Sequence, residues 1–302
     1  MKVVFPDINP LRIILNGYEK LFADEIPYHE ETVWYNSKWA STDVIYLFFA
    51  IPDDAEYTME AKLYDCNGWE VATLDLVDTE TEAYPGYLMY KITADLSTIR
   101  NEGIYYIHVF VSDNTDVEGT VFDFCSEPIH LKTSWPKTLL LEYYNEINDF
   151  DIPFEDLTDF VFQLRVEGGF PSSGFSPQSK DTIFIDQNHI PVLLDSIPYN
   201  VEKIQFGSAV GITNWQADCI NRALSCTHFY VDGIRYCKNE GAKLEPTHEN
   251  AYPLSGWSID LIRVEDEGST SFSLSRIYVL GAGEEAFRAG TGLSMFPAKP
   301  IE

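Results

Sequence analysis

The chain has 302 residues, enough for two domains of ordinary size, and 45% of them are apolar. Its 48 Asp and Glu residues outnumber 20 Lys and Arg residues, so the formal net charge is −28. A field of this sign repels nucleic-acid phosphates and anionic lipid, so we expect neither direct nucleic-acid binding nor membrane association. The favoured interpretation of this charge is that it keeps the protein soluble. The alternative is that it attracts a cation or a basic partner.

Aromatic residues are abundant, with 18 Tyr, 19 Phe and 6 Trp, and such side chains favour strands and interfaces. The five Cys residues are odd in number and irregularly spaced, and we expect them to be reduced core residues. No run of apolar residues is long enough to span a membrane, and the run from Val3 to Phe5 is too short for a secretory leader. We therefore expect a mainly β protein that is made and folded in a cytoplasm.

Residues 1–43 show no sustained period and predict a short strand plus an irregular N-terminal arm that could reach a neighbouring subunit. The apolar run 44–49 predicts a buried strand, and residues 57–64 alternate apolar with polar side chains as a half-buried strand does. The dipeptide Asn67-Gly68 predicts a tight primed turn, in which both residues take positive φ, followed by a return strand over 69–76.

Further strands are predicted over 87–92, 103–111 and 119–131, at the spacing of a sandwich. We therefore predict an immunoglobulin-like β-sandwich over residues 44–133. The buried Cys pair with an intervening Trp, which marks antibody domains, is not convincingly placed here, so the pattern predicts the architecture alone.

The rest of the chain predicts a second β-sandwich, a β-rich domain with one short helix, over 134–280. An apolar strand is expected over 138–144, and an alternating strand over 161–167 ends in a flexible break at Gly168 and Gly169. Residues 171–180, in which Ser, Gly and Pro dominate, predict an exposed loop.

The remaining elements follow in chain order. A hairpin-like pair of strands is expected at 182–186 and 192–194. Residues 215–225 carry apolar side chains at helical spacing, with Asn214 as the cap of this helix. Asp232-Gly233 predicts a second tight hairpin. Strands at 257–264 and 272–280 complete the sheet, and residues 281–302 form a C-terminal arm.

Cys219, Cys226, His228 and Cys237 are residue types that bind zinc, and they lie close together in the sequence. Their spacing contains no Cys-x-x-Cys pair, which favours buried apolar thiols and a partly buried histidine over a metal site.

Asp113, Asp116 and Glu118 place several oxygen ligands on one segment, as calcium requires. The spacing does not match the helix-loop-helix calcium motif, and a solvated turn is the favoured interpretation.

No nucleophile elbow, phosphate-binding loop or zinc-protease motif occurs, and the carboxylates are too many to nominate an acid-base pair. We expect no enzyme activity, no catalytic residue, no metal and no cofactor. Trp69, Trp215 and Trp257 could line a sugar-binding face. Packing in cores and interfaces is the favoured interpretation, because alternation within the strands turns many of the aromatic rings inward.

Residues 120–265 contain a distinctive succession of packing and turn residues: Ser126-Glu127-Pro128-Ile129, Phe162 to Gly169, Asp186-Gln187-Asn188, Ser196 to Tyr199, Asn214-Trp215 and Asp232-Gly233. This succession resembles structural proteins encoded by phages and prophages of gut Bacteroidetes, crAss-like phages included. The resemblance implies a virion component of the neck, the tail or the fibre-attachment region, which is made in the host cytoplasm. Its partners would then be other virion proteins and further copies of itself in a homo-oligomer.

The alternative is a carbohydrate-binding or adhesive surface module of a gut bacterium, with a glycan as its partner. We expect the interaction contacts to come from the loop 168–180 and from the segment after Gly281. The predicted interaction residues are Gly168, Gly169, Phe170, Pro171, Phe175, Phe287, Met295 and Phe296.

Overall fold

The computed structural model describes residues 3–15, 36–53, 57–113, 121–146, 149–185, 187, 189–207, 211–251 and 254–264, and it gives no side-chain exposure for 113 and 248–251. By its contacts the chain divides into two units, Met1–Arg263 and Val264–Glu302. The described part is mainly β, as predicted, and its one α-helix lies in the second half of the chain, also as predicted. The predicted domain limits stay predictions.

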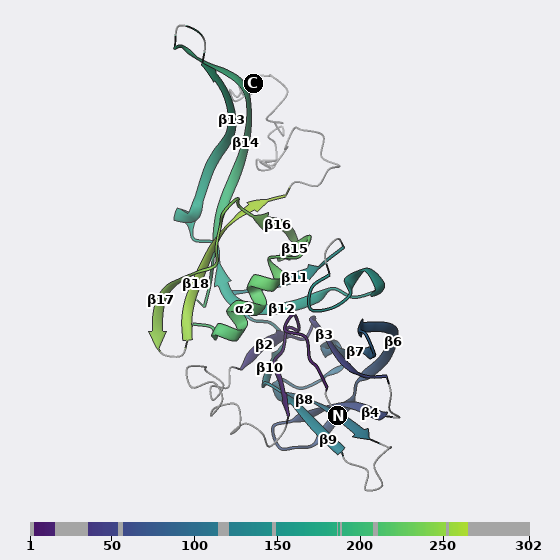
Figure 1. The fold of residues 1–302 in the computed structure, drawn as a ribbon. Coiled ribbons are helices and arrows are strands. Elements are labelled where there is room, and N and C mark those ends of the chain that lie inside the picture. Colours follow the sequence, from purple (N-terminus) through teal and green to yellow (C-terminus); the bar gives the residue numbers. More distant parts are fainter. Residues whose placement is uncertain are drawn as a thin grey trace, which may run out of the picture. The chain divides into compact units, whose positions relative to one another are not determined.

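The first half of the chain builds a seven-stranded sheet around its central strand β8 (Figure 1). Strand β8 pairs with β4 and with both β9 and β10, and β10 continues the sheet by a parallel pairing with β2. The other pairings of this sheet are antiparallel. Its strands are β1 (Ile13–Leu15), β2 (Ser37–Ala40), β4 (Tyr57–Asp65), β5 (Glu70–Thr73), β8 (Gly103–Asp113), β9 (Val121–Ser126) and β10 (Ile129–Lys132).

A three-stranded sheet packs against it, formed by β3 (Val44–Pro52), β7 (Tyr87–Asp95) and β6 (Asp75–Tyr84). Alternate residues of β3, such as Ile45 and Leu47, join the core between the two sheets. Phe48 lies on the opposite face of β3 and belongs to the core of the second half. Because both faces of β3 are covered, its sequence is a continuous apolar run rather than an alternating one. The immunoglobulin-like detail stays a prediction.

Three local predictions in this half are wrong. The return strand predicted over 69–76 is shorter, because β5 ends at Thr73 and the chain enters the three-stranded sheet with β6 at Asp75. The hairpin at Asn67-Gly68 forms, but only Gly68 has positive φ, because the Asp65 carboxylate accepts the backbone N–H of Asn67 and of Trp69 at 2.9 Å and shapes a longer turn. The strand predicted over 119–131 is two strands, β9 and β10. Pro128 separates them, since it has no N–H to donate to a ladder.

The second half forms one antiparallel sheet whose pairings close into a ring, because β14 pairs with both β12 and β18. Inward-facing residues such as Leu141, Leu164 and Phe229 fill the ring. Strands β13 and β17 lie outside the closed circuit. The strands are β11 (Thr138–Tyr144), β12 (Phe162–Gly169), β13 (Phe175–Ile185), β14 (Pro191–Phe206), β15 (His228–Val231), β16 (Ile234–Lys238), β17 (Glu245–Ala251) and β18 (Leu254–Arg263).

Helix α2 (Asn214–Ala223) buries Cys219 and Ile220 in this core, as the helical spacing predicted. Its cap is Thr213 rather than Asn214: the Thr213 hydroxyl accepts the Gln216 N–H, and the Gln216 side chain accepts the Thr213 N–H. This reciprocal capping box explains why the helix begins where it does.

Polar side chains on the outer face of β12 join the two halves. Arg165 donates from Nε and Nη2 to the two oxygens of Asp43, each at 2.7 Å, and Lys38 forms an ion pair with Glu167. The Gln163 side-chain oxygen accepts the N–H of Val44 at 2.7 Å. These polar residues alternate along β12 with the apolar residues that fill the ring.

The N-terminal segment lies between the two halves. Asn9 bonds through its side chain to the N–H and the carbonyl of Phe48, while the Ile8 carbonyl accepts the buried Tyr143 hydroxyl at 2.9 Å. The described parts of the predicted N-terminal arm therefore pack within their own chain, and residues 16–35 lie outside the described residues.

Candidate functional site

A long antiparallel hairpin is formed by β13 and the first twelve residues of β14, with Phe175 opposite Glu202 at its base and Ile185 opposite Pro191 near its end. Figure 1 shows the two strands running together beyond the other strands of their sheet. At about 3.4 Å per residue the ribbon is roughly 35 Å long. Among the described strands, β13 pairs only with β14, and β14 meets a third strand only from Val201 onward. Both edges of the ribbon therefore offer backbone groups for a further strand.

The half of the hairpin next to the body is polar. Ser196 donates to Asp181 across the strands at 2.6 Å, and the Tyr199 hydroxyl donates to Gln178 at 3.0 Å. The first of these hydrogen bonds lowers the pKa of the Asp181 carboxyl. Cross-strand hydrogen bonds of this kind hold a two-stranded ribbon in register where no core supports it.

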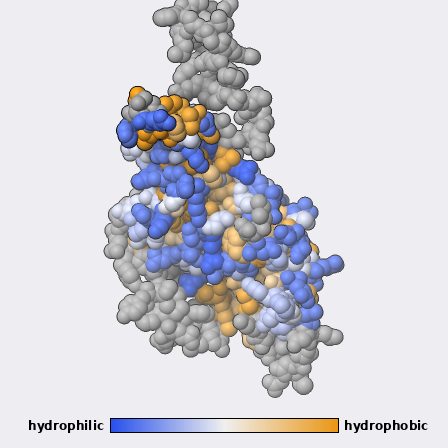
Figure 2. All heavy atoms as spheres, turned by 45° about the horizontal axis from the view of Figure 1, so that its top comes forward, coloured by the Kyte–Doolittle hydropathy of each residue, from blue (hydrophilic) through white to orange (hydrophobic). Residues whose placement is uncertain are grey.

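The far half of the hairpin is apolar. Seven of its large apolar side chains, together with Ile197 in the half next to the body, have exposed fractions between 43 and 62%, and we call these eight the apolar tip. Figure 2, in which the hairpin end is turned forward, shows hydrophobic side chains gathered there. The stretch 183–194 contains one Asp and no Lys or Arg in a chain of net charge −28. The apolar tip consists of Ile183, Phe184, Ile185, Ile190, Val192, Leu193, Leu194 and Ile197.

Both faces of the ribbon carry these side chains. Ile183 pairs with Leu193 and Phe184 pairs with Val192, and successive residues of a strand point to opposite faces. A ribbon that packs on its own protein has one apolar face, whereas this one has two. A contiguous exposed apolar patch of this kind marks a site of interaction with another molecule.

Five of the eight predicted interaction residues lie near the base of this hairpin. Gly168 and Gly169 do not form a flexible break, because β12 continues through them and pairs with Phe206 and Gln205 of β14. A Cβ on Gly168 would lie 2.5 Å from the Gln205 carbonyl oxygen, so glycine permits the close approach of the two strands.

The neighbouring predicted residues lie close by. Phe170 stacks on Tyr236 with ring centroids 5.5 Å apart, and Pro171 precedes a short 3-10 helix, Ser172–Gly174. Phe175 is 55% exposed and begins β13, so the loop predicted over 171–180 is exposed but is largely a strand. The other three predicted interaction residues, Phe287, Met295 and Phe296, lie outside the described residues.

The sequence predicted a hairpin at 182–186 and 192–194, and the structure confirms it. It did not predict that this hairpin is the exposed apolar site. The only available signal was that its apolar residues are consecutive rather than alternating, and buried strands share that pattern.

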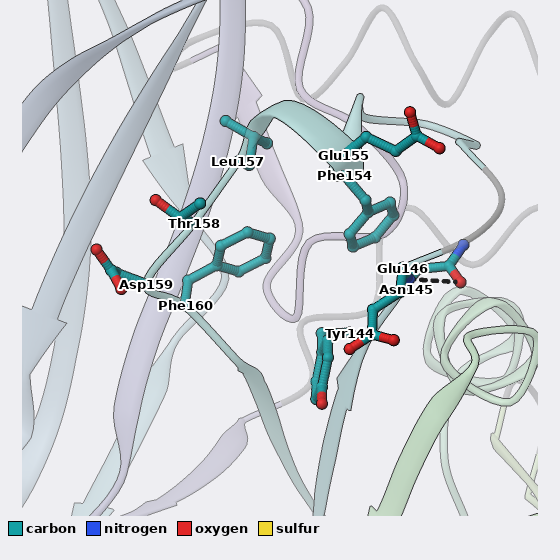
Figure 3. Close-up of a pocket in the computed structure, with 9 residues that line it drawn as sticks. All are labelled: Tyr144, Asn145, Glu146, Phe154, Glu155, Leu157, Thr158, Asp159 and Phe160. Carbon is teal, nitrogen blue, oxygen red and sulfur yellow. Dashed lines mark hydrogen bonds between the residues drawn. The ribbon is translucent and has the colours of Figure 1, made fainter.

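A pocket of about 420 Å³ lies between the end of β11 and the segment 154–160, which includes the 3-10 helix Phe154–Asp156 (Figure 3). Three aromatic rings and three carboxylates are among its walls. The lining residues are Tyr144, Asn145, Glu146, Phe154, Glu155, Leu157, Thr158, Asp159 and Phe160.

The residues considered for zinc are not brought together as a metal site. Cys219 is buried on α2 whereas Cys237 is exposed on β16, and no group of three or more metal-ligating side chains occurs in the described part of the chain. Burial raises the pKa of the Cys219 and Cys226 thiols to about 12, which disfavours the thiolate that zinc requires. Of the calcium candidates, Asp116 and Glu118 lie outside the described residues, as does the side chain of Asp113.

The three tryptophans considered for sugar binding belong to different elements. Trp69 is 73% exposed beside the β4–β5 turn, while Trp215 lies on α2 and Trp257 on β18. Sugar binding by these rings stays a prediction, and so does the expectation that the chain is not an enzyme.

Comparison with protein families, with curated proteins and with solved structures gives no match for this chain. Among the described residues, no helix has the length and apolar character needed to cross a membrane.

Proposed function

We propose that the chain is a structural component of a phage particle, in the neck, the tail or the fibre-attachment region, which acts through contacts between proteins. The observation that carries this proposal is the apolar tip of the β13–β14 hairpin, exposed on both faces. The resemblance of residues 120–265 to phage structural proteins supports the particle as the setting.

The partner that we propose for the hairpin is a second copy of the same chain. Eight half-exposed apolar side chains offer several hundred Å², the scale of one side of a standard protein interface. Identical ribbons are complementary to each other, because an unpaired strand edge of one copy can add to the same edge of the next. The tip is also nearly free of charge, so it can approach another copy with less repulsion than the acidic remainder of the chain.

The test is the native mass of the purified full-length chain by light scattering, compared with the double variant Phe184→Ser and Leu193→Ser. These positions lie on opposite faces of the ribbon. We expect a defined oligomer for the wild type and a monomer for the tip variant. The far-ultraviolet circular dichroism spectrum of the variant should match that of the wild type, because exposed positions contribute little to folding of the chain itself.

A matched control replaces two exposed valines of the first half, Val77→Ser and Val121→Ser, which lie 42 and 57% exposed. This control should keep the oligomer. A monomeric wild type, or a tip variant with the mass of the wild type, contradicts the proposal. In a parallel glycan-array measurement, binding that depends on Trp69 would favour the carbohydrate-binding alternative.

A further inference from the structure

One wall of the pocket beside β11 consists of aromatic rings that are packed into the core. Phe154 is buried, and Phe160 packs edge-on against Phe48 and Phe162 with ring centroids 4.8 and 5.2 Å apart. Both phenylalanines therefore continue the core of the second half, and their remaining surfaces line the hollow. Figure 3 shows the rings of Phe154, Phe160 and Tyr144 arranged around it.

The position of the Tyr144 ring is fixed by a stacked histidine. His228 stacks on it with ring centroids 4.2 Å apart and an angle of 4° between the planes. The two residues face each other across the β11–β15 ladder, so the stack is fixed by the strand register. His228 therefore covers one face of the ring, and Tyr144 is among the residues that line the pocket.

His228 also orients the carboxylate of Glu146, since Nε2 of the imidazole lies 3.0 Å from Oε2. The Glu146 backbone is fixed as well, because its N–H meets the Thr227 hydroxyl at 3.0 Å. Figure 3 shows the Glu146 carboxylate beside the Tyr144 ring, whereas the carboxylates of Glu155 and Asp159 point away from the three rings.

This arrangement matches an organic cation. Aromatic faces attract cations through their negative quadrupole, and a carboxylate next to them supplies a charged hydrogen-bond acceptor. Lys and Arg are absent from the described residues that line the pocket, which leaves no opposing charge on its walls. Anionic ligands are disfavoured by the three carboxylates.

We propose that this pocket binds a cationic side chain, arginine in preference to lysine, presented by a basic segment of a partner protein. A planar guanidinium can stack on the face of Tyr144 that His228 does not cover and at the same time donate hydrogen bonds to Glu146, whereas an ammonium group has no planar face to stack. The net charge of −28 steers a basic segment toward the chain. The site is separate from the hairpin and does not depend on the proposed function.

The test is calorimetric titration of the full-length chain, at 150 mM salt, with a peptide of four Arg-Gly repeats. Lys-Gly and citrulline-Gly peptides are titrated in parallel, because citrulline has the shape of arginine without its charge. We expect binding in the order arginine, lysine, citrulline, with citrulline at least tenfold weaker than arginine.

The matched variants are Glu146→Gln and Glu155→Gln, which remove the same charge from the same pocket but from carboxylates that point in different directions. Glu146→Gln should weaken arginine-peptide binding about tenfold, and Glu155→Gln less than twofold. Glu146 is 58% exposed in its side chain, so its variant should fold normally.

Three outcomes overturn the proposal: no binding of the arginine peptide by the wild type, equal weakening by both variants, or equal binding of the citrulline peptide. Spermidine, titrated as a further probe, tests whether the pocket binds a free polyamine instead of an arginine side chain. If spermidine binds with the same dependence on Glu146 and the peptide does not, the pocket takes a free cation and not a protein partner.

Discussion

At the scale of single residues, the Asp43–Arg165 ion pair is a buried contact between the two halves in which each charge needs its partner. The Asp43 side chain is 1% and the Arg165 side chain 12% exposed, and Asp43 also accepts the N–H of Ala40 at 2.7 Å. A charge at this position is tolerated only while its partner is present, because an unpaired buried charge is strongly unfavourable.

We therefore predict that Asp43→Ala lowers the free energy of unfolding by about 3 to 5 kcal/mol in denaturant titrations. The double variant with Arg165→Met should be less destabilised than the sum of the two single variants, since no unpaired charge remains. The exposed pair of Lys203 and Asp260 is the control, and Asp260→Ala should cost about 0.5 kcal/mol or less. Equal costs at the two aspartates would contradict this account.

A second prediction concerns the buried carboxyl of Glu127, whose Oε1 has no hydrogen-bond partner among the described residues. Burial raises the pKa of Glu127 to about 8, with Arg12 opposing the shift in part. The folded state therefore retains a proton that the unfolded state loses above about pH 4.5. The stability from this group is fully present below that pH and is lost as the pH rises through about 8.

Glu127→Gln should remove this dependence. Relative to the wild type, the variant should gain stability between pH 5 and pH 9, by about 2 kcal/mol or more, in denaturant titrations at both pH values. A difference between variant and wild type that is constant across this range would mean that Glu127 is ionised in the folded protein.

At the scale of the elements, the junction of β12 and β14 depends on the lack of a side chain at one position. We predict that Gly168→Ala lowers the free energy of unfolding by about 1 to 3 kcal/mol, because its Cβ meets backbone at Gln205. Gly169 is the adjacent control: nothing lies within 4 Å of a Cβ there, so Gly169→Ala should be close to neutral. The reverse order of effects in thermal unfolding would show that the two strands do not approach as described.

The same elements show what the sequence could predict. Asp232-Gly233 forms the predicted turn with both residues at positive φ, the conformation that this dipeptide favours, and hydrogen bonds between Asp232 and Leu140 tie the turn to β11. Asn67-Gly68 does not, because the side chain of Asp65, two residues earlier, controls that turn. The Ser, Gly and Pro residues of 171–180 predict a loop because they indicate local backbone preference. They carry no information on the distant segment 197–202, with which residues 175–180 pair as a strand.

The pocket could not be predicted from the sequence. Tyr144 and His228 are 84 positions apart, and the ladder between β11 and β15 alone brings them face to face. The composition indicates that aromatic residues form interfaces and that a basic partner is one interpretation of the acidic charge. It does not indicate the strand register that places the Glu146 carboxylate beside the Tyr144 ring, because that register exists only in the folded sheet.

At the scale of the whole molecule, an acidic chain has to associate through its least charged surface. Burying the half-exposed side chains of the tip would contribute on the order of 5 to 10 kcal/mol before the costs of association. Repulsion between copies of net charge −28 opposes this.

Salt should consequently strengthen the oligomer. We predict that the fraction of oligomer at fixed protein concentration rises between 20 and 500 mM NaCl, because screening removes repulsion and leaves apolar contacts intact. Analytical ultracentrifugation at a series of salt concentrations measures this. Dissociation with rising salt would indicate an interface held by ion pairs instead of the apolar tip.

The most direct measurement of the central claim is mass spectrometry of particles purified on a density gradient from a host that carries the gene. The account predicts that the chain co-purifies with the particles in a fixed ratio to the other particle proteins, and that particles made with the tip variant lack it. A chain that stays with the host cell fraction while complete particles form without it would contradict the account.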